Sequence, residues 1–237
     1  MENGHSGKGK IFLGGGGNEV QSFAIDQAFM REFTSFRILY VPIAMESGNG
    51  DYDACVNWLS NALSQHLSDP EKLEIHPLYD PNSLSSVDKE NFDGLYIGGG
   101  NTYFLRKALA DTDFDTFIRS FLADGKSVYG GSAGAIVFGR SIATVAEENE
   151  IGEDAYSVGL SLLGEYSVVC HYAEYQYDNI TQLVGSVVSP IIAIPETSGL
   201  IVQESEARVV GRDSIHIFST GGVDVLQPGD SFSLILG

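Results

Sequence analysis

Two kinds of segment alternate along the chain. Short runs that are apolar throughout, and rich in β-branched and aromatic residues, alternate with longer stretches in which apolar residues recur at helical spacing. Strands that are buried on both faces of a parallel sheet have such continuous apolar runs. We therefore expect an α/β fold with a mostly parallel central sheet flanked by helices. The pattern predicts strands over residues 10–15, 36–44, 72–79, 93–100 and 126–131, and helices over 19–33, 51–67 and 102–123.

The last part of the chain has a different pattern. From residue 191 onward, short strand-like runs follow one another with turn residues between them and little room for a helix. Such runs predict an antiparallel extension at one edge of the sheet. No linker-like segment separates this part from the rest, so we expect a single domain over residues 1–237, with residues 1–9 flexible.

The charge balance limits the class of partner. The chain has 13 Lys and Arg against 32 Asp and Glu, a formal net charge of −19. Nucleic acids and anionic membrane surfaces attract basic patches, so we expect neither as a partner. The sequence contains no apolar run long enough to cross a membrane and no signal-peptide core, which favours a cytoplasmic protein. Monomer and homodimer both stay open.

Cysteine and histidine are too sparse for a metal centre. The chain has two cysteines, Cys55 and Cys170, and no CxxC pair, so both are expected to be small buried residues without a disulfide. Its five histidines are scattered, without the spacing of metal ligands. We expect no metal ion and no cofactor.

Three glycine-rich loops are candidates for binding or catalysis, at residues 13–20, 97–105 and 129–140. A dinucleotide-binding fingerprint needs glycine at the first, third and sixth positions, and Glu19 or Val20 occupies the last of these in the first loop. No Gly-Lys-Ser/Thr follows any of the loops, which excludes a P-loop. Bare amides in the first loop leave phosphate binding open.

The third loop matches the nucleophile-elbow motif G-x-S-x-G. Gly130 to Gly134 satisfy it, after a predicted strand and before a predicted helix. This turn would project the Ser132 hydroxyl into a cleft and aim the Ala133 amide at a developing oxyanion. An ordinary strand–helix turn is the alternative.

A serine nucleophile needs a base and a carboxylate. His171 stands at the end of an apolar run and is the preferred base, with a purely structural histidine as the alternative. Glu196 also ends an apolar strand and is the preferred acid, against a surface glutamate at a strand end. Glu147 is the rival acid, in a loop with several acidic residues where a solvated surface is the ordinary interpretation.

Several motifs together carry a family resemblance. "IGGGNTYFL", "GGSAGA", "GLSLL" before a strand ending in "HY", and a later "PE" occur in order from about residue 10 to about residue 210. This set resembles the dipeptidase E family of serine peptidases, also called aspartyl dipeptidases, whose wider relatives include cyanophycinase. The resemblance implies a fold related to the class I glutamine amidotransferases, which is flavodoxin-like, with a serine at the elbow in place of their cysteine.

The resemblance also implies roles for individual residues. Ser132 would be the nucleophile, His171 the general base and Glu196 the third member of a Ser-His-Glu triad, with Glu147 as the alternative acid. Amides of the second and third loops would form the oxyanion hole, and the second loop would also bind substrate. The residues concerned are Gly100 and Ala133 for the oxyanion, and Gly99 and Asn101 for the substrate.

The chain departs from the family pattern after His171. Aspartyl dipeptidases tend to have basic residues there, whereas "HYAEYQYDNITQLVGS" has neither Arg nor Lys. A buried substrate carboxylate needs a fixed cation, so the preference for aspartate is not carried over. Tyr172, Tyr175 and Tyr177 are candidates for the pocket lining, with ordinary packing as the alternative.

The sequence thus predicts a serine-type peptidase, with a short peptide as its substrate. It would hydrolyse dipeptides or short peptides through an acyl-enzyme, without a cofactor. One alternative is a cyanophycinase-like exopeptidase that cleaves an arginine-rich polymer, which the acidic composition would suit. The other is a non-catalytic protein of the same fold that binds small molecules or peptides.

Overall fold

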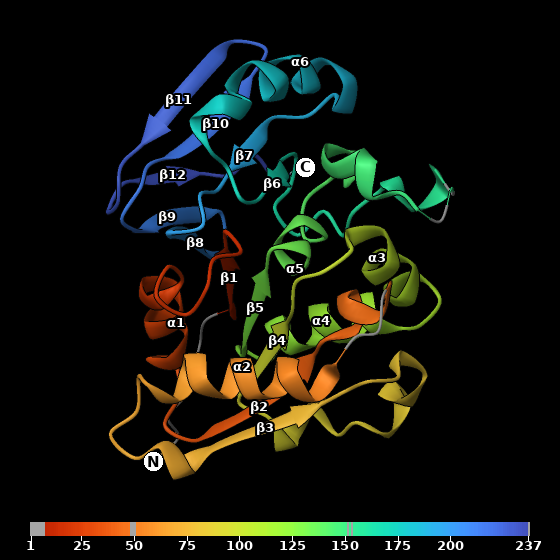
Figure 1. Cartoon of the computed structure of the whole chain (residues 1–237), viewed down its shortest axis with the longest axis vertical. Coiled ribbons are helices and arrows are strands. Elements are labelled where there is room, and N and C mark those ends of the chain that lie inside the picture. Colours follow the sequence, from red (N-terminus) through yellow and green to blue (C-terminus); the bar gives the residue numbers. More distant parts are fainter. Residues whose placement is uncertain (1–7, 48–50, 151, 153, 237) are drawn as a thin grey trace.

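The computed structural model describes residues 8–47, 51–150, 152 and 154–236. Its centre is an eight-stranded sheet with the order β12-β9-β8-β1-β5-β4-β2-β3 (Figure 1). Five neighbouring strands of this sheet are mutually parallel, and each falls within one of the predicted strand segments. They are β1 (Lys10–Gly14), β2 (Phe36–Val41), β3 (Leu73–Pro77), β4 (Gly94–Ile97) and β5 (Ser127–Gly131). The expected α/β fold with a mostly parallel central sheet is confirmed.

The antiparallel extension is present beside β1. Strand β8 (Ser198–Gln203) pairs antiparallel with β1, followed outward by β9 (Glu206–Gly211) and β12 (Ser231–Ser233). The other late strands form a second sheet of four strands, with the order β11-β10-β7-β6. Our expectation that all the late strands extend the main sheet was therefore wrong. The second sheet comprises β6 (Ser167–Val169), β7 (Ile191–Ala193), β10 (Ile215–Ser219) and β11 (Gly222–Leu226).

Helices cover both faces of the central sheet. Successive strand residues point to opposite faces, so Phe12 packs with one group of helices while Leu13 packs with the other. Helices α1 (Phe23–Met30) and α2 (Tyr52–Ser64) cover the first face. The second face is covered by α3 (Thr102–Ala110), α4 (Phe114–Ala123) and α5 (Ala133–Ile136), while α6 (Tyr177–Val187) packs on the second sheet.

Short 3-10 helices occupy several connections between these elements. They are η1 (Ile43–Ser47), η2 (Pro70–Lys72), η3 (Pro81–Ser86), η4 (Lys89–Asn91), η5 (Ala143–Glu148), η6 (Asp154–Ser157) and η7 (Glu174–Gln176). One of them, η1, includes the last two residues of the segment expected as a strand over residues 36–44. Several observed helices and strands are therefore shorter than the predicted segments, but their order along the chain is the predicted one.

Two local features bear on the expectations for the N-terminal part of the chain. Helix α1 begins four residues later than predicted, because the Asn18 side chain accepts from the amides of Val20 and Gln21 and holds them in a turn. Residues 1–7 of the segment expected to be flexible lie outside the described residues. Gly9, at the end of that segment, is buried and donates to the Leu122 carbonyl at 2.8 Å.

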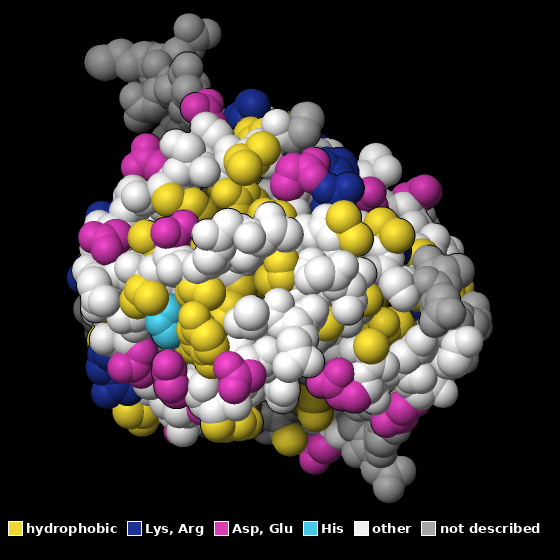
Figure 2. Space-filling view, turned by 90° about the horizontal axis from the view of Figure 1, so that it is seen from above, with side chains coloured by type: hydrophobic (Ala, Val, Ile, Leu, Met, Phe, Trp, Pro, Cys, Tyr) yellow, Lys and Arg dark blue, Asp and Glu magenta, His cyan; other side chains and the backbone are white. Residues whose placement is uncertain are grey.

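The surface reflects the acidic composition. In the face shown in Figure 2, acidic side chains are spread over the described surface, while basic ones gather in small groups near its margin. None of the described helices combines the length and apolarity that crossing a membrane would require.

Candidate active site

Three glycine loops meet at one edge of the central sheet. Strands β1, β5 and β4 are neighbours and run parallel, so their carboxyl ends lie side by side. Each of these strands leads directly into one of the glycine-rich loops, at residues 14–17, 130–134 and 98–100. The carboxyl edge of a parallel sheet is the usual place for an active site in such folds.

Ser132 occupies a sharp turn between β5 and α5. Its backbone has φ 51° and ψ −114°, a conformation that residues with a side chain rarely adopt. The amide of Ser132 donates to the Gly14 carbonyl at 3.2 Å, which ties the turn to the end of β1. The local geometry is that of a nucleophile elbow.

His171 and Glu196 complete a hydrogen-bonded line with this serine. Nε2 of His171 lies 2.9 Å from Oγ of Ser132, and Nδ1 lies 2.9 Å from Oε1 of Glu196. His171 follows β6, and its amide donates to the Gly15 carbonyl at 2.9 Å. The structure therefore brings together the preferred nucleophile, base and acid from three separate parts of the chain.

Glu196 fixes the tautomer of the imidazole. An ionised carboxylate only accepts hydrogen bonds, so Nδ1 carries the proton and Nε2 is free to accept one from Ser132. The hydrogen bond from His171 holds the pKa of Glu196 below its ordinary value, which keeps this carboxylate ionised. Gln21 also donates to Oε2 of Glu196 at 2.6 Å and lowers the same pKa. Sequence reasoning missed Gln21, because a glutamine beside a loop has no distinctive pattern.

The first glycine loop packs against the side chains of Ser132 and His171. A Cβ added at Gly16 would lie 2.4 Å from Cε1 of His171 and 3.0 Å from Cβ of Ser132, and the φ of Gly16 is +95°. A larger residue would therefore displace the histidine. This explains the run of glycines in "LGGGGNEV" without phosphate binding. The sequence signal that could have indicated this contact is the position of the loop directly after β1, the strand that pairs with β5.

Three backbone amides close to Ser132 in the fold have no hydrogen-bond partner among the described residues. Within the part of the chain that the structure describes, no hydrogen bond uses the amides of Gly99, Gly100 or Ala133. Gly99 lies against the serine, since an added Cβ would be 3.1 Å from Cβ of Ser132. Gly100 has φ +136°, and an added Cβ would lie 2.2 Å from the Ala44 carbonyl oxygen. Unpaired amides beside a nucleophile are the components of an oxyanion hole.

Asn101 and Glu147 have other surroundings. Asn101 caps α3, since its Oδ1 accepts from the Phe104 amide and its Nδ2 donates to the Glu148 carbonyl. Both ends of the Asn101 side chain are thus used within the fold, which argues against the expected contact with substrate. Glu147 is exposed on η5, and no hydrogen bond or ion pair between described residues joins it to His171. Its neighbour Glu148 instead accepts from the Thr102 amide at 2.7 Å.

The tyrosines that follow His171 do not line the site. Tyr172 is buried against His216, and Tyr177 packs on Phe218, both over the second sheet. Tyr175 is 83% exposed. Of the two interpretations left open by the sequence, ordinary packing describes Tyr172 and Tyr177, because the chain continues into η7 and α6 over the second sheet immediately after His171.

The described residues contain no cluster of metal ligands. Three or more His, Cys, Asp or Glu side chains arranged to hold a metal ion do not occur there. Both cysteines are free thiols in the structure, with Cys170 buried and Cys55 half-buried. His5 lies outside the described residues.

Comparison with known proteins shows the family of the chain. The family model described as "Peptidase family S51" matches residues 11–210. The chain belongs to peptidase family S51. Its relatives in this family include Peptidase E of Shewanella denitrificans, 30% identical over 190 residues that cover 76% of this chain and 77% of that protein. Peptidase E of Pasteurella multocida is 30% identical over 202 residues, covering 81% and 82%.

A solved structure shares the fold of this S51 chain. The crystal structure of a peptidase from an acI-B1 Actinobacterium superposes with a TM-score of 0.70 at 18% sequence identity, covering 96% of this chain and 98% of that one. At this identity the likeness concerns the fold alone. Membership of the family makes the chain a peptidase, a hydrolase of peptide bonds.

Proposed function

We propose that this chain is a serine peptidase that hydrolyses dipeptides or short peptides through a Ser132–His171–Glu196 triad. The observation that carries the proposal is the hydrogen-bonded line from Ser132 Oγ through both imidazole nitrogens to Glu196, with 2.9 Å at each step. This spacing allows proton transfer from the hydroxyl to Nε2. Within the described part of the chain, no hydrogen bond or ion pair joins Glu147 to His171, as the role of the acid would require.

The reaction follows from the position of each group. Ser132 Oγ attacks the scissile carbonyl carbon while its proton passes to Nε2 of His171, and the carbonyl oxygen becomes an oxyanion. The amides of Ala133 and of Gly99 or Gly100 stabilise that charge, and Glu196 stabilises the imidazolium. His171 then protonates the departing amine, which leaves an acyl-enzyme on Ser132. Water attacks the ester with His171 as base, releasing the acid and restoring the serine.

Hydrolysis of a dipeptide panel tests this proposal. Wild type should cleave at least one class of dipeptide, and Ser132→Ala should reduce kcat/KM by at least about 10³-fold, since the nucleophile is lost. Circular dichroism and thermal melting establish that both proteins are folded. Full activity in folded Ser132→Ala would refute the proposal.

A further inference from the structure

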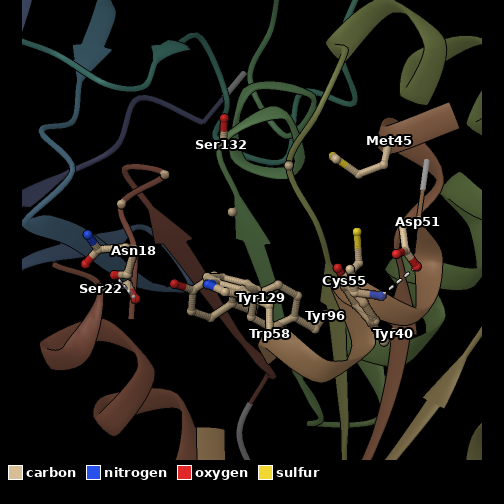
Figure 3. Close-up of a pocket in the computed structure, with 15 residues that line it drawn as sticks. Asn18, Ser22, Tyr40, Met45, Asp51, Cys55, Trp58, Tyr96, Tyr129 and Ser132 are labelled. Atoms are coloured by element: carbon tan, nitrogen blue, oxygen red, sulfur yellow. Dashed lines mark hydrogen bonds between the residues drawn. The ribbon is translucent and has the colours of Figure 1, made fainter. Parts of the chain in front are cut away.

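A cavity of about 510 Å³ opens beneath the nucleophile, between α2 and the carboxyl edge of the sheet (Figure 3). Ser132, Gly131 and Gly99 form its end nearest the reacting hydroxyl. The absence of a side chain at Gly99 leaves this end open, since an added Cβ would approach Ser132 Cβ to 3.1 Å. A group that fills the cavity is therefore attached close to the carbonyl that Ser132 attacks.

Tyrosine rings form the floor of the cavity. Tyr40, Tyr96 and Tyr129 are direct cross-strand partners on β2, β4 and β5. The rings of Tyr96 and Tyr129 are stacked with centroids 4.3 Å apart, and those of Tyr40 and Tyr96 meet edge to face at 5.7 Å. Burial raises the pKa of Tyr96 and Tyr129 well above 10, so their hydroxyls stay neutral. The floor is a fixed aromatic surface that exists before any ligand binds.

The facing wall is also largely apolar. Helix α2 contributes Trp58, Cys55 and Ala54, and Met45 of η1 closes one end. Figure 3 draws Trp58, Tyr129 and Tyr96 below Ser132, and Trp58 packs against the hydrophobic cluster that contains both tyrosines. Rings and apolar side chains would surround an aromatic or branched aliphatic side chain here, and removal of its apolar surface from water favours binding.

Charges near the cavity disfavour an acidic ligand. Among the described residues that line it, the charged side chain is Asp51, and Lys and Arg are missing from them. A second carboxyl group, that of Asp26, lies behind the lining residue Ser22, whose hydroxyl donates to it at 2.7 Å. A substrate carboxylate in the cavity would find no cation among these residues to pair with, and it would lie near the carboxylate of Asp51. Both effects destabilise the charged form of the substrate.

We infer that this cavity binds the side chain of the residue that supplies the scissile carbonyl, and that it selects large aromatic or branched aliphatic side chains over acidic ones. The inference rests on the proposed function, because the cavity is placed relative to the attack by Ser132. Trp58 is the specificity-determining residue of the α2 wall, facing the tyrosine floor.

Aminoacyl p-nitroanilides test the selection on the intact enzyme, because only the acyl residue varies among them. We expect kcat/KM for the phenylalanyl and leucyl substrates to exceed that for the aspartyl substrate by at least about 100-fold. A lysyl substrate should also be cleaved more slowly than the phenylalanyl one, because most of the lining is apolar and Asp51 already accepts from the Ala54 amide at 2.9 Å as the N-cap of α2. Fastest cleavage of the aspartyl or the lysyl substrate would overturn the inference while leaving the serine mechanism intact.

Substitution of Trp58 tests whether this residue causes the preference for large apolar side chains. Trp58→Ala should lower kcat/KM for the phenylalanyl substrate about tenfold or more and change that for the alanyl substrate less than about threefold, since a small side chain does not reach the wall. Tyr175→Ala, which removes an exposed aromatic ring away from the cavity, is the matched control and should change neither value. Equal losses for both substrates in a folded Trp58→Ala protein would overturn the assignment of Trp58.

One further outcome separates this inference from the proposed function. If no substrate is cleaved and a fluorophosphonate fails to label Ser132, the proposed function fails and the inference falls with it. If Ser132 is labelled but aspartyl substrates are preferred, the inference alone fails. The substrate panel on wild type decides the question even if Trp58→Ala does not fold.

Discussion

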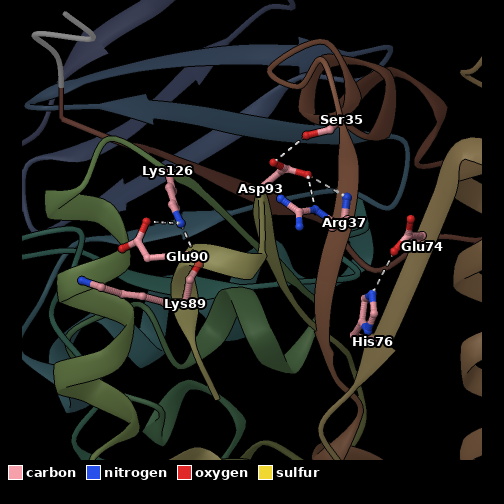
Figure 4. A network of polar contacts seen from close by, with 8 residues as sticks. All are labelled: Ser35, Arg37, Glu74, His76, Lys89, Glu90, Asp93 and Lys126. Carbon is pink, nitrogen blue, oxygen red and sulfur yellow. Dashed lines mark hydrogen bonds and ion pairs between the residues drawn. The ribbon is translucent and has the colours of Figure 1, made fainter. Parts of the chain in front are cut away.

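The two edges of the parallel sheet differ in the residues that flank the strands. At the amino edge, ion pairs join the beginnings of the strands, such as Arg37 with Asp93 and Lys126 with Glu90 (Figure 4). These pairs span 3.7 and 3.5 Å, and the Glu90 side chain is 68% exposed. Exposed pairs of this kind contribute little to stability, about 0–1 kcal/mol.

At the carboxyl edge, glycines replace side chains and the backbone is less regular. Ser132 and His171 both have positive φ values, and Gly16 approaches their side chains so closely that a Cβ has no room. This edge is where the proposed catalytic line lies. The amino edge therefore carries ion pairs at the surface, whereas the close contacts at the carboxyl edge require particular residues at particular positions.

After Ser132→Ala, the largest effect is expected from the acid at the carboxyl edge. Glu196→Gln keeps the size of the side chain but removes the charge that orients His171 and stabilises the imidazolium. We expect kcat/KM to fall by about 10²–10⁴-fold. Glu147→Gln, the matched change at the rival position, should alter kcat/KM less than about twofold. A larger loss in Glu147→Gln than in Glu196→Gln would reverse the assignment of the acid.

The next largest effect is expected from the glycine that faces the histidine. Gly16→Ala places a methyl group 2.4 Å from Cε1 of His171, so the imidazole must move, and kcat/KM should fall about 100-fold. Gly229→Ala is the control, because Gly229 has a similar φ of +99° but no atom within 4 Å of an added Cβ. Equal activity losses in both variants would mean that backbone strain, not contact with His171, is responsible.

Asp26, behind the cavity, should make stability depend on pH. Burial raises its pKa from the ordinary value of 3.8 to about 6. Between about pH 4 and pH 6 the native state therefore keeps a proton that the unfolded state has released, so the free energy of unfolding falls as pH rises through this window.

Asp26→Asn should abolish this dependence and raise the free energy of unfolding at pH 8 by about 2 kcal/mol. Urea unfolding at pH 4, 6 and 8 measures both effects. Asp53→Asn, the same exchange at an exposed position of α2, is the control and should leave the pH dependence as in wild type. A wild-type protein whose stability does not fall between pH 4 and pH 6 would contradict the account of Asp26.

The smallest effect is expected at the amino edge. Glu90→Gln removes the partner of Lys126, which still donates to the Lys89 carbonyl at 2.6 Å. The free energy of unfolding should change by less than about 1 kcal/mol, and kcat/KM should stay the same. A loss of activity in Glu90→Gln would show that the two edges are not independent.

Much of the fold could be predicted from the sequence because buried parallel strands have a local signature. The runs that became β1, β2, β4 and β5 are apolar on both faces, and their order along the chain defines the α/β class. The second sheet could not be predicted, because a run such as β7 has the same local pattern whichever strand it pairs with. Pairing is decided by contacts between residues far apart in the sequence.

The candidate site was partly predictable for the same reason. Ser132, His171 and Glu196 each follow a strand-like run, and the ends of strands are where such residues gather. Gln21 and Trp58 follow no such rule. Gln21 meets Glu196 across 175 positions of the chain, and the helical pattern around Trp58 shows that its face is covered without showing that a cavity lies there.

Labelling with a fluorophosphonate, read by intact mass, tests the central claim most directly. Wild type should gain a single adduct, and folded Ser132→Ala should gain none, because the probe reacts with a serine that is activated by a neighbouring base. An adduct of equal yield on both proteins, or none on folded wild type even with a smaller sulfonyl fluoride, would contradict an activated Ser132. The second of these results would favour a protein that binds peptides without cleaving them.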